Sequence, residues 1–170
     1  MHLDCQKLWR FALHLLAAGD LRRDHIGKSI MTIEIKDVKD GLGNVILGSG
    51  IVKEEEYIDV MKKYLTQDEE KFKKYRYSLA DWTAINEAKI SSDAVQLIAR
   101  LCKQAAKVNP NIIVGSVTDQ NYIFGLARMA YIMRDDTDWE NKAFRNRAEA
   151  EAWIKQRVKE KYSIDDLTFS

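Results

Sequence analysis

One segment of the chain is apolar almost throughout its length: Asn111-Ile112-Ile113-Val114-Gly115-Ser116-Val117, residues 111–117. A run of this kind is typical of a strand that helices cover on both faces of its sheet. Before it, the sequence predicts a helix that starts at the capping signal Ser91-Ser92-Asp93 and ends at Asn109-Pro110. After it, Asp119 is expected to cap a helix over residues 120–133. Strands that alternate with helices indicate the α/β class, with parallel strand pairs.

The same alternation continues in both directions along the chain. Residues 31–36 alternate apolar and polar side chains, as a half-buried strand does, and a glycine-containing turn joins them to a second strand over residues 44–50. The order is completed by a helix from about residue 53, an aromatic-rich strand over residues 75–82, a short strand over residues 142–145 and a helix over residues 147–161. The sequence therefore predicts a hairpin followed by alternating helices and strands.

Residues 1–30 differ in character from the rest of the chain. They contain a candidate amphipathic helix and a basic, glycine-containing segment. We expect them to form an appendage, or to reflect an over-extended gene start; the competing interpretation is a docking helix that packs on the domain or on a partner. The domain itself is expected over residues 31–162, followed by a frayed tail over residues 163–170.

The composition suits a single soluble globular domain. The 170 residues are 46% hydrophobic, and 27 basic side chains nearly balance 26 acidic ones, which gives a net charge of +1. That balance argues against nucleic acid as a partner, because nucleic-acid binding needs a basic face of one sign. No membrane span is expected, because residues 8–18 fall short of the roughly 20 apolar residues that a span needs. Two cysteines, Cys5 and Cys102, without metal-ligand spacing suit a reducing cytoplasm.

The sequence offers little catalytic chemistry. All three histidines, His2, His14 and His25, precede residue 31, so the expected domain lacks the commonest general base and metal ligand. Acidic residues at 135–138 and 165–166 could hold a metal ion, but acids in a connection between a helix and a strand are more often solvated. We therefore expect no catalytic residues, no metal site and no cofactor, and hence no enzyme.

A family resemblance is carried by the segment Ala143-Phe144-Arg145-Asn146-Arg147-Ala148-Glu149-Ala150-Glu151-Ala152-Trp153-Ile154. This segment resembles the closing unit of the STAS/SpoIIAA-like superfamily, in its STAS/SEC14-like branch: a short strand that ends in Phe-Arg, then a helix that contains Ala-Trp-Ile. The order of elements over residues 31–162 is also similar to that family. The resemblance implies an α/β, SpoIIAA-like mixed β-sheet flanked by α-helices, here with an extra N-terminal helix.

The resemblance also implies a function. Many STAS proteins are non-catalytic regulatory or protein-interaction modules, such as anti-sigma factor antagonists, and a partner kinase phosphorylates a serine near the start of one helix. Ser92, and next to it Ser91, occupy the similar place here, although Asp93 beside them would repel a phosphate. Capping of the helix is the competing interpretation of these serines. The implied partner is a kinase or another regulatory protein, and an unpaired edge strand of the hairpin could support a homodimer.

The SEC14-like side of the family implies an alternative, the binding of an apolar small molecule or lipid between helices and sheet. Tyr77, Trp82, Met129 and Met133 are the residues expected to line such a pocket. The two functions predict different interiors. An interaction module is expected to have a filled core, whereas a binding module needs a pocket lined by aromatic residues.

Overall fold

The computed structural model describes residues 32–66 and 68–170. The predicted appendage and its helix, residues 1–30, lie outside the described residues, as do Cys5 and all three histidines. The elements follow in the order β1 (Ile33–Asp37), β2 (Gly43–Lys53), α2 (Glu54–Thr66), α3 (Glu69–Phe72), β3 (Tyr77–Lys89), α4 (Ser92–Val108), β4 (Ile113–Val117), α5 (Asn121–Ile132), β5 (Glu140–Phe144) and α6 (Arg147–Tyr162).

The strands form one five-stranded sheet in the order β1-β2-β3-β4-β5. Strand β1 pairs antiparallel with β2, and the remaining neighbours pair in parallel. The antiparallel hairpin turns at Gly41, whose φ of +68° favours a residue without a Cβ, and the Asp40 carboxylate accepts a hydrogen bond of 2.7 Å from the Leu42 amide. The predicted α/β class, with a mixed sheet flanked by helices, is confirmed.

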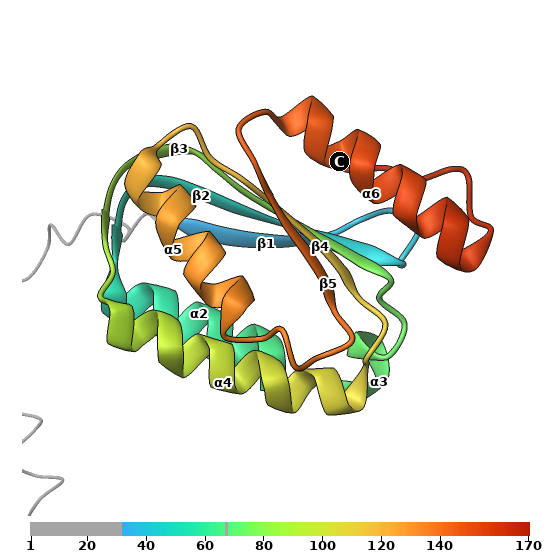
Figure 1. Cartoon of the computed structure of the whole chain (residues 1–170), viewed down its shortest axis with the longest axis horizontal. Coiled ribbons are helices and arrows are strands. Elements are labelled where there is room, and N and C mark those ends of the chain that lie inside the picture. Colours follow the sequence, from blue (N-terminus) through green and yellow to red (C-terminus); the bar gives the residue numbers. More distant parts are fainter. Residues whose placement is uncertain (1–31, 67) are drawn as a thin grey trace, which may run out of the picture. The chain divides into compact units, whose positions relative to one another are not determined.

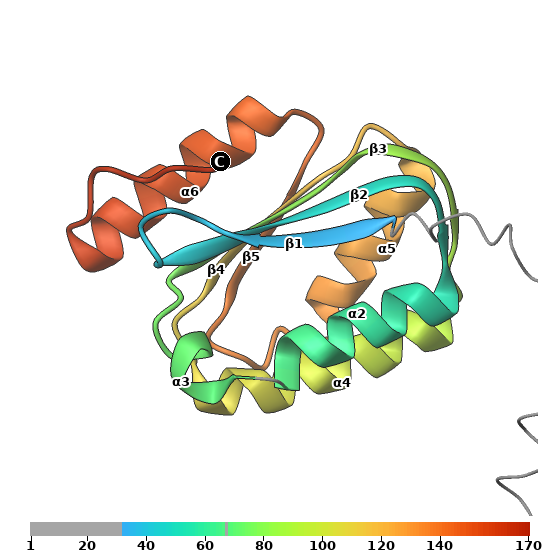
Figure 2. The same ribbon diagram turned by 180° about the vertical axis from the view of Figure 1, so that it is seen from behind.

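Helices cover the two faces of the sheet unequally. Helices α2, α4 and α5 lie on one face, and α6 with the C-terminal segment lies on the other (Figures 1 and 2). The buried residues divide accordingly into two clusters, one that includes Ile46 and Ile98 and a second that includes Leu79 and Ile154. The predicted interior strand, β4, contributes Ile113 and Val117 to the α6 side, so it is packed on both faces as its apolar sequence indicates.

Three local predictions need correction. The aromatic-rich strand continues to Lys89 instead of ending near residue 82, because β3 pairs along almost the whole length of β2. Helix α5 has Gln120 as its N-cap, not Asp119, and no side chain caps it. The segment after α6 is not frayed: Leu167 is buried, and the Phe169 ring packs edge-on against Tyr77 with centroids 5.3 Å apart.

Candidate ligand-binding cavity

An apolar cavity lies between the sheet and helices α2, α4 and α5. Its volume is about 120 Å³. For comparison, an engineered apolar cavity of about 150 Å³ in another protein stays dry and binds benzene. Most of the described side chains that line the cavity are aliphatic or aromatic, and none of these described residues carries a carboxylate. Folded interiors normally hold few voids larger than a water molecule, so a space of this size is available to a small ligand.

The alternation of β3 determines which of its side chains reach the cavity. Ser78, Ala80 and Trp82 line it, whereas Tyr77 and Leu79 point to the opposite face and belong to the α6 cluster. Tyr77 is therefore not a cavity residue, contrary to its predicted role as a ligand-lining side chain. It is fully buried, and its hydroxyl donates to the Thr168 carbonyl at 2.7 Å.

The two predicted methionines also lie elsewhere. Met129 and Met133 border a shallow depression on the outer side of α5, together with Ile132. The stripe of α5 that faces the cavity has helical spacing and continues past the end of the helix: Ile123, Leu126, Ala127, Ala130, Tyr131 and Arg134. Leu126, Met129, Ala130 and Met133 have the spacing of one helical face, but the inner face of α5 is rotated from it, so Leu126 and Ala130 line the cavity and the two methionines do not.

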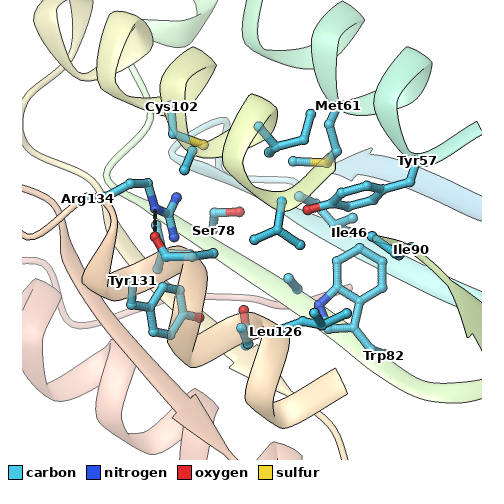
Figure 3. A pocket seen from close by; sticks show the side chains of 18 of the residues that line it. Ile46, Tyr57, Met61, Ser78, Trp82, Ile90, Cys102, Leu126, Tyr131 and Arg134 are labelled. Carbon is cyan, nitrogen blue, oxygen red and sulfur yellow. Dashed lines mark hydrogen bonds between the residues drawn. The ribbon is translucent and has the colours of Figure 1, made fainter. Parts of the chain in front are cut away.

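Aromatic rings form one end of the cavity. Tyr57 from α2 meets Trp82 from β3 edge to face, with ring centroids 6.5 Å apart (Figure 3). Gly48 on β2 makes room for this indole, because a Cβ at position 48 would collide with the Trp82 ring. Ile46 and Ile90 also border this end, so it presents an almost wholly apolar surface.

Polar groups gather at the other end. The Arg134 guanidinium points into the cavity, near Cys102, Ser78 and Tyr131 (Figure 3). Arg134 is only 6% exposed. Its Nε donates to the Ala130 carbonyl at 3.0 Å, and the guanidinium carbon lies 5.2 Å from the centroid of the Tyr131 ring. The sequence analysis did not single out this residue, which continues the inner stripe of α5.

The thiol and the phenol beside Arg134 are kept neutral by their surroundings. Burial raises the pKa of the Cys102 thiol, although Arg134 acts in the opposite direction. Burial likewise raises the pKa of the Tyr131 hydroxyl, against smaller lowering contributions from Ser116 and Arg134. Cys102 is therefore a poor nucleophile, because the reactive form of a cysteine is the thiolate.

Tyr57 indicates space at the aromatic end of the cavity. Burial raises the pKa of its hydroxyl, yet the side chain keeps part of its accessible surface. Tyr57 is one of the lining residues, so we infer that the accessible part of its side chain faces the cavity.

Beneath the cavity, a short buried chain of hydrogen bonds ties the sheet to α2. The Ser78 hydroxyl donates to the Asn44 side-chain oxygen at 2.8 Å, and the Asn44 amide donates to the Tyr64 hydroxyl at 2.6 Å. The polar atoms of these three side chains are thus hydrogen-bonded to one another, and they hold the floor of the cavity in place. Arg134 differs from them because its side chain is charged.

The two predicted phosphoacceptors lie at the start of α4. Ser91 is the N-cap, and its hydroxyl accepts a hydrogen bond from the Ala94 amide at 3.2 Å, as the capping interpretation predicts. Ser92 is the first residue of the helix and is exposed. The Glu54 carboxylate accepts from the Ser91 amide at 2.6 Å, and the pKa of Glu54 is lowered by its hydrogen bonds to Ser91. A second acid thus joins Asp93 beside the serines. Neither serine lines the cavity, and their phosphorylation stays a prediction.

Two broader features complete the description. Within residues 32–66 and 68–170, no three Cys, His, Asp or Glu side chains come together in a way that could hold a metal ion. Among the helices in that part of the chain, none combines the length and the apolar character required to cross a bilayer.

A structural similarity links this chain to a known protein. No family model matches the sequence, and no curated protein is detectably similar to it. Among solved structures, the chain is similar to an uncharacterised protein of the DUF3478 family from Shewanella loihica PV-4, which is described as having a SpoIIAA-like fold. The two share 18% identity over 76% of this chain and 99% of that chain, with a TM-score of 0.46. The fold named for that protein is the one that the sequence resemblance predicted.

Proposed function

We propose that this domain binds an apolar small molecule in the cavity between its sheet and helices α2, α4 and α5, and that it does so without catalysis. The observation that carries the proposal is the apolar cavity of about 120 Å³. A module that only binds other proteins through its surface would be expected to have a filled core in its place. The lining supports binding over bond-breaking, since its ionisable side chains are an arginine, tyrosines and a buried thiol.

The physical driving force is the removal of apolar ligand surface from water. Each buried methylene contributes about 0.8 kcal/mol, and this corresponds to a roughly fourfold gain in affinity. For a series of uncharged 1-alkanols, the affinity should therefore rise about fourfold for each added carbon until the chain fills the cavity. A site on the open surface would show a weaker dependence on length.

The natural tryptophans provide the readout. Trp82 and Trp139 line the cavity, whereas Trp153 packs against Phe144 on the α6 face, with centroids 5.5 Å apart. Titration of the full chain with 1-hexanol, followed by NMR of the indole N–H signals, should shift Trp82 and Trp139 and leave Trp153 in place. Trp9 supplies a fourth indole signal and lies outside the described residues. Equal shifts of the Trp82, Trp139 and Trp153 signals, or no shift at all, would contradict the proposal.

A filled variant gives the matched control. Ala127 lies on the inner stripe of α5, so Ala127→Leu should occupy the cavity and weaken hexanol binding at least tenfold. Ala152 is exposed on α6, and Ala152→Leu adds the same atoms without reaching the cavity. Unchanged binding in Ala127→Leu would place the ligand elsewhere.

The regulatory role implied by the STAS resemblance is a second candidate, favoured by the outer side of α5. Ile132 is 67% exposed there, beside Met129 and Met133. A pull-down in which one identified protein binds the unaltered chain and is lost with Ile132→Asp would support this role. Identical recovery by both chains would count against it. The homodimer, the kinase partner and the cytoplasmic location stay predictions, and light scattering during size-exclusion chromatography tests the first of them.

A further inference from the structure

The polar end of the cavity specifies a ligand class. We propose that the ligand is a small monocarboxylic acid whose carboxylate binds the Arg134 guanidinium and whose apolar body occupies the aromatic end of the cavity. This inference rests on the proposed function. It goes further than that function because it assigns a charge, a size and an anchoring residue to the ligand.

Arg134 is a buried cation without an acidic partner. None of the ion pairs within residues 32–66 and 68–170 includes it. The acids nearest in sequence, Asp135 and Asp136, are exposed, and Asp136 pairs instead with Lys103 at 2.9 Å. Buried charges in proteins are normally paired, so an arginine that is 94% buried and points into an empty cavity is a candidate for binding an anion from outside.

The contacts that Arg134 makes leave N–H donors of its guanidinium available. Its Nε donates to the Ala130 carbonyl at 3.0 Å, and the Cys102 thiol is a second hydrogen-bonding neighbour of the side chain. The guanidinium plane also lies near the Tyr131 and Trp139 rings, 5.2 and 5.7 Å from their centroids. These contacts orient the guanidinium. A guanidinium carries five N–H donors, more than these contacts use, and the fork of its terminal nitrogens matches a carboxylate.

The charge of the cavity favours a single negative charge. Among the lining residues within 32–66 and 68–170, Arg134 is the one cationic side chain and none is acidic. One cation balances one carboxylate, whereas a phosphate would bring further negative charge without a second cation to offset it. Ser116 also lines the cavity, and its hydroxyl is a further donor, whereas the Tyr131 hydroxyl donates to the Lys142 carbonyl at 3.4 Å.

The volume limits the size of the acid. At about 120 Å³, the cavity is comparable with one of about 150 Å³ that accommodates benzene. A phenyl-substituted acetate or a short aliphatic acid matches this space, and a long-chain fatty acid does not. The ring would lie toward Tyr57 and Trp82, at the far end from Arg134.

The test compares phenylacetate with its uncharged isostere, phenylacetamide, by calorimetric titration of the full chain. The unaltered protein should bind phenylacetate at least tenfold more tightly than the amide. Arg134→Met should abolish that preference, and Arg134→Lys should retain part of it. Arg128→Met removes an exposed arginine from α5 and should change neither affinity.

The outcomes separate the two proposals. If phenylacetamide binds as tightly as phenylacetate, or more tightly, the ligand class is wrong while the binding cavity stands. If hexanol, phenylacetamide and phenylacetate all fail to bind, the proposed function itself is wrong. The comparison in the unaltered protein needs no substitution, so it decides the matter even if an Arg134 variant fails to fold. A preference for phenylacetate that persists in Arg134→Met would overturn the assignment of Arg134.

Discussion

Replacement of Arg134 by methionine should leave the folded state as stable as before or make it more stable. The substitution loses the hydrogen bond to Ala130, a charge-assisted bond of about 1.5–3 kcal/mol, and aromatic contacts of about 1 kcal/mol. It also removes the desolvation cost of an unpaired buried cation, which is on the order of several kcal/mol. The methionine can pack against the same rings, which contributes up to about 1 kcal/mol. The net change in the free energy of unfolding should lie between zero and a stabilisation of about 2 kcal/mol.

Urea unfolding followed by circular dichroism measures this change by linear extrapolation. Arg128→Met, on the exposed side of α5, should stay within about 0.5 kcal/mol of the unaltered protein. A destabilisation of about 2 kcal/mol or more by Arg134→Met would refute the reasoning, because it would identify Arg134 as a structural residue whose contacts outweigh its burial cost. A stability gain combined with the loss of phenylacetate binding is the pattern expected of a residue kept for function.

Three further predictions concern the scaffold around the cavity. Ser91→Ala removes the N-cap of α4 and should lower the stability by about 1 kcal/mol, as urea unfolding can measure; no change would mean that the cap is dispensable. Leu167→Ala should cost about 2 kcal/mol because the side chain is buried, whereas a frayed tail would tolerate it. Burial acts to raise the pKa of Glu140, but hydrogen bonds from Arg157 and Lys161 outweigh it and hold that pKa below the ordinary value of 4.5. The stability that Glu140 contributes is therefore present above pH 4.5 and lost as the pH falls below it, so between pH 6 and pH 3 Glu140→Gln should lose less stability than the unaltered chain.

Local patterns in the sequence predict most of the fold. The hairpin follows from the alternation of residues 31–36 and the Gly41 turn, and α4 follows from its serine cap and from the proline after Asn109. These features depend on neighbours in the chain, so they can be identified without the tertiary structure. The length of β3 and the packing of Phe169 against Tyr77 depend on contacts between distant segments, and no local pattern specifies them.

The cavity was predictable only in part. Trp82 was expected to face a ligand pocket and does line the cavity, whereas Tyr77 could not share that pocket, because an odd separation along a strand puts the two on opposite faces. Helical spacing from Ile123 reaches Arg134, so the arginine could have been placed on the inner stripe of α5. That the space in front of Arg134 is empty is a property of packing among α2, α4 and α5, and sequence spacing carries no information about it.

A crystal structure of the full chain grown with phenylacetate would locate the ligand. We expect electron density inside the cavity, with the carboxylate within hydrogen-bond distance of the Arg134 terminal nitrogens and the ring against Tyr57 and Trp82. A cavity closed by collapsed side chains, or phenylacetate seen only on the outer surface, would contradict the view that this domain is built around a binding site.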